Sequence, residues 1–352
     1  MEAQVRVVPY DPSWPRLFRA EAEQLMSDWG PHAVYVHHVG STSVPGLPAK
    51  PIIDLISVLD DIAAADELAE RAALRGYEGM GEYGLPGRRY FRRPGFHVHG
   101  YAVGDPAIDR HLAFRDYLRV HPREQTRYGA LKTHLARLHP HSIADYMDGK
   151  DSYVRQVETT AMAWWARVPL VLVTGPVGVG KSTVADALSD CLSKQGLAHW
   201  LMDLDRLTDI APRAPGDPYA GGPLRASVRA VWRVMRSAGA RAAVFPRVLE
   251  SSAEAADLAR EIPGAELWMV RLRASKPVLT ERIAGRERGE SLRWHTERAQ
   301  HLAALMDRAN LGDLIIDTDG KTPEAIADMI ARGFRARHGW LWGDRSEGDE
   351  SG

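Results

Sequence analysis

The sequence has very little cysteine: a single thiol, Cys191, stands among 352 residues. One cysteine excludes an internal disulfide and a cysteine-rich zinc site. Long apolar runs are also missing, and without about 18 consecutive apolar residues we expect no membrane-spanning helix. The first residues lack the apolar stretch of a secretion signal, so we expect a cytoplasmic location.

Neither sign of charge is in excess, because 45 basic residues face 46 acidic ones. Divided at Arg167, the chain has a net charge of −1 in its first part and 0 in its second. This balance gives no bulk attraction to nucleic acid or to an anionic membrane, although it leaves room for a local basic pocket. Ten of the 14 histidines precede residue 167.

The rest of the composition is that of an ordinary globular protein, with 45% hydrophobic and 26% charged residues. The length predicts two domains. A helical pattern runs to about Trp165, and Pro169 then disfavours helix at Val168, so we place the boundary near residue 167. We expect domains over 1–166 and 167–337, followed by a disordered polar tail over 338–352.

A phosphate-binding loop is predicted at the start of the second domain. An apolar run at 170–174 predicts a buried strand, and apolar spacing over 181–194 predicts a helix. The intervening segment fits the pattern G-x-x-x-x-G-K-[ST]. The residues expected to surround the nucleotide phosphates are Gly175, Pro176, Val177, Gly178, Val179, Gly180, Lys181, Ser182 and Thr183.

The residue types in this loop match the chemistry of a polyphosphate. Glycines let backbone N–H groups point inward, and the helix N-terminus adds its dipole. Lys181 supplies a cation for the β- and γ-phosphates, and the hydroxyl of Ser182 suits Mg²⁺. Such contacts do not distinguish ATP from GTP.

Two carboxylates follow the next predicted strand, which spans about 198–202. Asp203 and Asp205 lie where open α/β sheets bind ligands, so they could hold metal-bound water or accept a proton from a substrate hydroxyl. The alternative is that Asp205 only caps a short helix.

Later strands and helices alternate, which predicts a parallel α/β/α sandwich. With its loop, its Asp-Leu-Asp and a late Asp-Thr-Asp-Gly at 317–320, this half resembles the small P-loop kinases. That group includes kinases of gluconate, shikimate, adenylylsulfate and dephospho-coenzyme A. The resemblance implies a lid whose arginines, here Arg282, Arg286 and Arg288, neutralise the transferred phosphoryl group. The alternative is a solvated charge run. No later strand ends in Asp-Glu, which argues against a motor ATPase.

The first domain resembles the GrpB family over about residues 3–162. The likeness is carried by segments at 36–56, 84–91, 97–99, 111–119, 130–132 and 145–150. It implies an α+β fold of the nucleotidyltransferase superfamily, whose pattern is Gly-Ser, then Asp-x-Asp/Glu, then a third carboxylate. Gly40, Ser41 and Asp54 match this pattern. The position two residues after Asp54 is Ile56, which adds no metal ligand.

Two histidines replace the third carboxylate of that pattern. His97 and His99 project to one face of a strand and, with Asp54, suit Zn²⁺, Mn²⁺ or Fe²⁺ better than Mg²⁺. These residues could hold a second divalent metal in an active transferase, or the site could bind an anionic ligand without two-metal chemistry. The further alternative is a scaffold in which the histidines are only hydrogen-bonded. The residues expected to bind an anionic ligand are Gly40, Ser41, Thr42, Lys50, Arg88, Arg89, Lys132 and Lys150.

The function predicted from these features is ATP- or GTP-dependent phosphoryl transfer to a small molecule. Lys181, Asp203, Asp205, Arg286 and Arg288 are the expected catalytic residues. A dephospho-coenzyme A kinase-like activity is one specific form of this hypothesis. Two alternatives stay open, namely nucleotidyl transfer at the first domain and nucleotide sensing without turnover. The sequence names neither the acceptor nor the oligomeric state.

Overall fold

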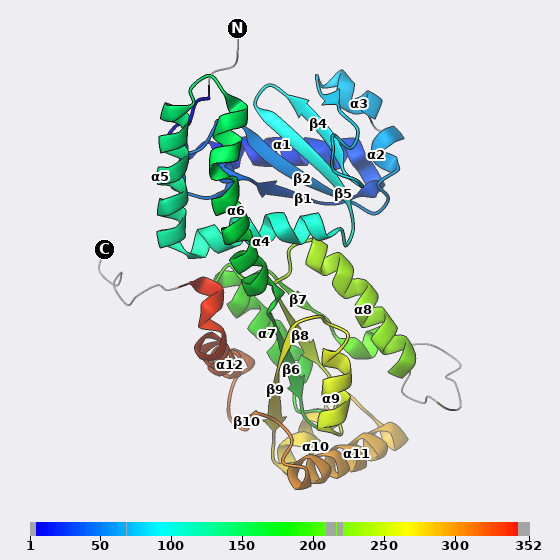
Figure 1. Ribbon diagram of the computed structural model, residues 1–352. Coiled ribbons are helices and arrows are strands. Elements are labelled where there is room, and N and C mark those ends of the chain that lie inside the picture. Colours follow the sequence, from blue (N-terminus) through cyan, green and yellow to red (C-terminus); the bar gives the residue numbers. More distant parts are fainter. Residues whose placement is uncertain (1–4, 68, 209–215, 217–220, 344–352) are drawn as a thin grey trace. The chain divides into compact units, whose positions relative to one another are not determined.

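A computed structural model describes residues 5–67, 69–208, 216 and 221–343. Contacts divide the chain into two compact units. The first is built mainly from Met1–Trp165, and the second from Ala166–Met235 and Gly239–Gly339. Within the described residues, each unit holds a five-stranded sheet with helices packed against it (Figure 1).

The sheet of the first unit has the strand order β1-β2-β5-β4-β3. Its strands are β1 (Ala33–Val39), β2 (Ile53–Leu59), β3 (Glu78–Gly79), β4 (Arg89–Arg93) and β5 (Phe96–Ala102). β2 and β5 run parallel, and the other neighbours are antiparallel. Because side chains alternate along a strand, Asp54 and Ile56 of β2 share one face and Leu55 points to the other.

Helices cover both faces of this sheet. α1 (Trp14–Trp29) buries Trp14, Leu25 and Trp29 in a core that includes Leu55. Ile56 belongs to the opposite core, which α4 (Pro106–Val120) and α6 (Ile143–Ala166) help to form. The Asp54 side chain therefore lies on the face covered by α4 and α6.

The remaining helices of the first unit are α2 (Ala64–Glu67), α3 (Ala69–Leu74) and α5 (Pro122–Leu138). α5 and α6 stand side by side in Figure 1, and the rings of Tyr128 and Tyr153 stack between them with centroids 5.7 Å apart. A hypothetical Cβ on Gly149 of α6 would lie 2.6 Å from Leu135 Cδ2 of α5. The two helices thus approach closely where α6 carries glycine.

The second unit contains the predicted parallel sheet, with the strand order β10-β9-β6-β8-β7. Its strands are β6 (Val168–Thr174), β7 (His199–Leu201), β8 (Ala242–Pro246), β9 (Ala265–Arg273) and β10 (Leu314–Asp317). Every residue of β6 is buried, as its apolar sequence predicts. The strand order reverses at β6, which is where ligands bind in open α/β sheets.

Helices alternate with these strands. They are α7 (Lys181–Lys194), α8 (Gly221–Ser237), α9 (Ser252–Ala259), α10 (Lys276–Ala284), α11 (Gly289–Arg308) and α12 (Pro323–His338). α7 follows β6 directly after the glycine-rich loop, as predicted. It carries the single cysteine, Cys191, whose thiol donates a hydrogen bond to Asp328 Oδ1 of α12 at 3.4 Å.

The predicted start of the tail at residue 338 is wrong. α12 ends at His338, and a 3₁₀-helix over Gly339–Trp342 follows it. Leu341 is buried, so this segment packs rather than extending into solvent. The rest of the predicted tail, 344–352, lies outside the described residues. Over the described ranges, no helix combines the length and the apolarity needed to span a membrane.

Candidate functional site

The loop between β6 and α7 needs glycine at two places. At Gly175, with φ +148°, a Cβ would lie 2.5 Å from the carbonyl oxygen of Leu272. At Gly178, with φ +82°, it would lie 2.7 Å from Ile283 Cγ1. Gly180 adopts a left-handed conformation (φ +100°) and serves as the N-cap of α7. The chain therefore turns sharply and delivers the N-terminus of α7 to the end of a buried strand.

Lys181 lies across this loop. Its Nζ donates to the carbonyl oxygens of Gly175 and Pro176 at 3.2 and 3.1 Å. Burial lowers the pKa of Lys181 to about 8, Asp205 and Asp203 act in the opposite direction, and Arg286 lowers it further. The ammonium group thus stays mostly protonated at neutral pH, within reach of anything that the loop binds.

Ser182 and Asp203, which the sequence assigned to the same site, lie in contact. The Ser182 hydroxyl donates to Asp203 Oδ2 at 3.0 Å. Both groups supply oxygen atoms of the kind that Mg²⁺ prefers, so these residues fit a Mg²⁺ ion beside the loop. Asp203 Oδ1 also accepts from the backbone N–H of Asp205 at 3.2 Å, which makes Asp203 the capping residue of the following turn.

Asp205 has a different neighbour. Its Oδ1 accepts from Arg247 Nη1 at 3.0 Å, and Arg247 directly follows β8. Sequence reasoning missed Arg247, although its place just after a parallel strand was the available signal. The two carboxylates are therefore divided, with Asp203 beside Ser182 and Asp205 beside a cation from the neighbouring strand.

The three predicted lid arginines have three different environments. Arg282 Nη1 donates to the carbonyl oxygen of Val179 and to Thr318 Oγ1, at 3.1 and 3.0 Å. Arg282 thus connects α10 to the glycine-rich loop. Arg286 is exposed and close enough to Lys181 to affect its pKa. Arg288 is also exposed, but its guanidinium donates to the carbonyl oxygens of Ala284 and Glu287.

In the first unit, Gly40 and Asp54 define a second polar centre. Val39 pairs with Asp54 across β1 and β2, and Gly40 follows with φ +68°. A Cβ on Gly40 would lie 2.4 Å from Asp54 Oδ2. The absence of a side chain at Gly40 therefore lets the carboxylate rest against the backbone.

Histidines surround the Asp54 carboxylate. His97 Nδ1 lies 3.4 Å from Asp54 Oδ1. Burial alone would raise the pKa of Asp54, but His97, His99 and His111 together hold it below its usual value. Burial also lowers the pKa of His99 to about 4 and that of His111 to about 3. The His99 and His111 rings are therefore neutral at physiological pH, while the Asp54 carboxyl group is ionised.

The predicted metal site at Asp54, His97 and His99 is not supported. Among the described residues, no three His, Cys, Asp or Glu side chains gather closely enough to hold a metal ion. His97 and His99 do share a face of β5, but His99 Nδ1 lies 3.4 Å from Arg88 Nη1. A cationic neighbour at that distance competes with a metal for the ring nitrogen.

Two of the predicted anion ligands are engaged elsewhere. Arg89 forms a two-fold hydrogen bond with Asp66, at 2.6 and 2.8 Å, on the other side of the strand. The Thr42 hydroxyl is 1% exposed and bonds the carbonyl oxygen of Ile52 and the ring of His38. Neither side chain faces the Asp54 carboxylate. Arg88 is buried and donates to the carbonyl oxygen of Tyr83 at 2.7 Å.

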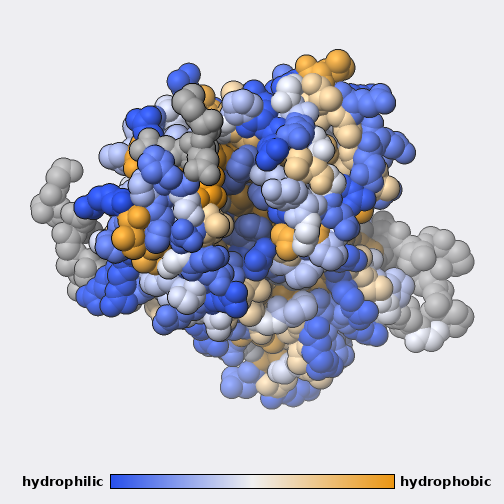
Figure 2. Space-filling view, turned by 45° about the horizontal axis from the view of Figure 1, so that its top comes forward, coloured by the Kyte–Doolittle hydropathy of each residue, from blue (hydrophilic) through white to orange (hydrophobic). Residues whose placement is uncertain are grey.

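The predicted lysines do come together. Lys50 Nζ and Lys150 Nζ lie 5.6 and 5.7 Å from the centroid of the Tyr146 ring. Lys132 is 2% exposed, lies 4.6 Å above the Tyr128 ring and donates to the carbonyl oxygen of Pro48 at 2.5 Å. Figure 2 turns the upper part of Figure 1 forward and shows a hollow in which hydrophilic residues gather.

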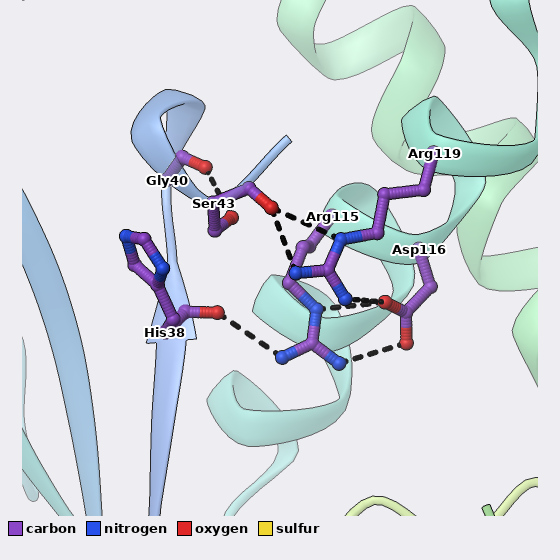
Figure 3. Close-up of polar contacts among 6 residues, drawn as sticks. All are labelled: His38, Gly40, Ser43, Arg115, Asp116 and Arg119. Carbon is purple, nitrogen blue, oxygen red and sulfur yellow. Dashed lines mark hydrogen bonds and ion pairs between the residues drawn. The ribbon is translucent and has the colours of Figure 1, made fainter. Parts of the chain in front are cut away.

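Sequence reasoning also missed the residues that hold the loop after β1. Arg119 donates twice to the carbonyl oxygen of Ser43, at 3.0 and 2.7 Å, and Arg115 donates to that of His38 at 3.1 Å (Figure 3). Asp116 accepts from both arginines. His111, Arg115 and Arg119 recur every four residues, and this polar stripe on a helix was the signal available in the sequence.

Comparison with known proteins divides the chain in the same way. Residues 4–160 match the family described as GrpB protein. YqkA of Bacillus subtilis is 43% identical over 165 residues, which cover 46% of this chain and 48% of that protein. The chain thus spans about half the length of this relative. BH1888 of Halalkalibacterium halodurans is 37% identical, with 46% of this chain and 84% of that protein covered.

Other similarities point to kinases. A dephospho-CoA kinase of Mycolicibacterium paratuberculosis is 30% identical over 191 residues, covering 46% of this chain and 47% of that protein. A gluconokinase structure from Sinorhizobium meliloti is 18% identical and covers 49% of this chain, with a TM-score of 0.35. A score this low carries no argument about function.

A GrpB structure from Enterococcus faecalis is 44% identical, covering 45% of this chain and 98% of that one, with a TM-score of 0.44. The family match at residues 4–160 lies in the first unit, and the chain covers 84% of BH1888 at 37% identity. Through that unit, the chain belongs to the GrpB family.

Proposed function

We propose that the second unit transfers the γ-phosphoryl group of ATP or GTP to a small-molecule acceptor. The observation that carries this proposal is the joint placement of Lys181 over the glycine-rich loop and of Ser182 against Asp203. Loop N–H groups and the N-terminus of α7 bind the phosphates, and Lys181 neutralises their charge. Ser182 and Asp203 hold Mg²⁺, which neutralises charge on the phosphates when it is bound.

The remaining charged residues are assigned by their neighbours. Asp205 faces the acceptor, with Arg247 holding its carboxylate in place. As the acceptor oxygen bonds to the γ-phosphorus, the bond to the leaving diphosphate breaks and the acceptor proton passes to Asp205. Arg286 stabilises the transferred phosphoryl group, whereas Arg288 supports the lid backbone.

Dephospho-CoA is the first acceptor to test, because one relative is named as a dephospho-CoA kinase. That match covers 46% of this chain, which is about the size of one unit. Either unit could account for a match of this size, so the match does not assign the activity to the second unit. Gluconate and shikimate belong in the same panel because the loop and lid resemble the kinases of these compounds.

The first experiment measures binding of Mg·ATP by calorimetry. Lys181→Ala should weaken binding by roughly 10- to 100-fold, the range expected for losing a charge-assisted contact. Lys194→Ala, at the far end of the same helix, is the matched control and should bind as the parent does. Equal affinity of Lys181→Ala and the parent would refute the assigned phosphate contact.

The second experiment follows transfer of label from γ-labelled ATP to each acceptor, with mass spectrometry of the product. A phosphorylated product that disappears in Asp205→Asn but forms with Lys194→Ala supports the proposal. Tight ATP binding without label transfer to any acceptor would instead favour nucleotide sensing.

A further inference from the structure

Lysine is scarce in this chain and is concentrated at one place in the first unit. Only seven of the 45 basic residues are lysines, and just three of these, Lys50, Lys132 and Lys150, precede residue 167. They come from the segment before β2, from α5 and from α6. Although far apart in sequence, all three pack against the neighbouring rings of Tyr146 and Tyr128.

The three ammonium groups repel one another. Burial and the nearby Lys150 lower the pKa of Lys132 to about 7. Burial and Lys50 lower the pKa of Lys150, while Asp54 and Asp151 act in the opposite direction. Crowding of this kind costs free energy unless an anion lies between the charges. Lysine, unlike arginine, can relieve such crowding by losing a proton, and the pKa values of Lys132 and Lys150 are lowered accordingly.

Access to the three lysines differs. Lys132 is almost fully buried and already donates to the carbonyl oxygen of Pro48. It therefore contributes electrostatic attraction to a bound anion without contacting that anion directly. Lys50 and Lys150 are partly exposed. Ser41 lies beside the Tyr128 hydroxyl and supplies a further donor at the start of the loop that follows β1. Lys50 and Lys150 therefore offer accessible ammonium groups around the Tyr146 ring.

We propose that Lys50 and Lys150, with Lys132 behind them and Ser41 beside them, bind a phosphate group of a small-molecule ligand in the first unit. This site is separate from the loop at Gly175–Ser182. Asp54, which His97 polarises, lies on the same face of the sheet and accepts a hydrogen bond from a hydroxyl of the same ligand. A phosphate ester with a nearby hydroxyl combines these features, as nucleotides and sugar phosphates do.

The test titrates the full-length protein with inorganic pyrophosphate by calorimetry. The double variant Lys50→Gln/Lys150→Gln should lose one class of binding site, with affinity there falling by roughly tenfold or more. Lys194→Gln is the lysine control and should behave as the parent. Lys181→Ala removes only the contact at the glycine-rich loop of the second unit. Loss of binding at that loop and loss of binding at the first-unit lysines are therefore seen in different variants. An unchanged titration of the double variant would overturn the proposal, whatever Lys181→Ala does.

A second measurement uses the unaltered protein, in case the double variant does not fold. An amine-acetylating reagent is applied with and without pyrophosphate, and modified lysines are identified by mass spectrometry. Pyrophosphate should protect Lys50 and Lys150 but not Lys276 or Lys321. Equal modification with and without pyrophosphate would count against the site. Repeating the protection with ATP and with ribose 5-phosphate shows which kind of phosphate ester binds more tightly.

Discussion

Gly40 occupies a position at which the first unit leaves no room for a side chain. Its backbone has φ +68°, and the Asp54 carboxylate lies where a Cβ would have to be. Two effects therefore act at one residue. A non-glycine residue strains the backbone, and its Cβ displaces the carboxylate from His97.

Gly40→Ala should lower the free energy of unfolding by about 2–4 kcal/mol, as the sum of backbone strain and steric overlap. Gly30→Ala is the matched control, because Gly30 has φ +55° but no atom within 4 Å of a hypothetical Cβ. Urea unfolding of both variants separates the two effects. If Gly30→Ala destabilises the protein as much as Gly40→Ala does, the contact with Asp54 is not what requires glycine.

Single residues also show what the sequence could not predict. Arg88 and Arg89 are adjacent and were assigned the same role, yet they lie on opposite sides of the sheet with different partners. Thr42 follows Ser41 in the pattern, but its hydroxyl is used inside the protein. A sequence pattern identifies residue types. The hydrogen-bond partner of each side chain depends on elements that are distant in the sequence and adjacent in the fold.

At the scale of elements, α4 fixes the loop after β1. Arg115 and Arg119 reach from one helix to two backbone carbonyl groups, and Asp116 holds both guanidinium groups in position (Figure 3). A planar guanidinium presents five N–H donors in fixed directions, which suits simultaneous bonding to a carbonyl oxygen and a carboxylate better than the compact ammonium group of lysine does. The loop that carries Ser41 therefore depends on α4.

Arg119→Lys should lower the free energy of unfolding by about 1 kcal/mol, since it loses hydrogen bonds to Ser43. It should also weaken pyrophosphate binding in the first unit without changing Mg·ATP affinity. Arg127→Lys is the control, because the Arg127 side chain is 72% exposed and pairs with Glu124 within one helix. Denaturant unfolding and calorimetry provide the two readouts. Identical behaviour of both variants would show that the loop does not need Arg119.

The elements themselves were largely predictable from the sequence. α7 has the predicted bounds, because its apolar spacing and the glycines that precede it mark the helix locally. The phosphate-binding loop is equally local, since strand, loop and helix are contiguous. The division of Asp203 and Asp205 was not predictable, because it depends on Arg247 at the end of another strand.

At the scale of the whole molecule, buried histidines make stability depend on pH. Burial lowers the pKa of His38 to about 3, of His99 to about 4 and of His111 to about 3. Below pH 6.5 these histidines bind protons in the unfolded chain but remain unprotonated in the folded protein. Stability is therefore fully present above about pH 6.5 and falls as the pH drops toward 4. The lowered pKa of Asp54 acts in the same direction, because its contribution to stability is lost as the pH falls, but this loss begins only near pH 3.8.

We expect the free energy of unfolding to decline between pH 7 and pH 5, by up to about 1.4 kcal/mol per pH unit for each of these histidines. His111→Asn should make this slope shallower, whatever it does to stability at pH 7. His141→Asn, at an exposed position, should leave the slope unchanged. Urea titrations at several pH values measure it. Parallel slopes for His111→Asn and the parent would contradict the assignment.

The division into two units followed from length and from Pro169, but the lysine site did not. Its members lie at positions 50, 132 and 150, and only the packing of α5 and α6 against the loop before β2 brings them together. Resemblance to a family suggested these residues without showing their convergence.

α7 begins at the phosphate-binding loop and carries the only thiol of the chain ten residues later. At 1.5 Å per residue, Cys191 lies about 15 Å along the helix from Lys181. Burial and Asp328 raise the pKa of Cys191, so coupling to a maleimide dye would need mildly alkaline conditions. One fluorophore would then sit at a defined site on α7, and its emission would report occupancy of the proposed nucleotide site in real time without any engineered cysteine.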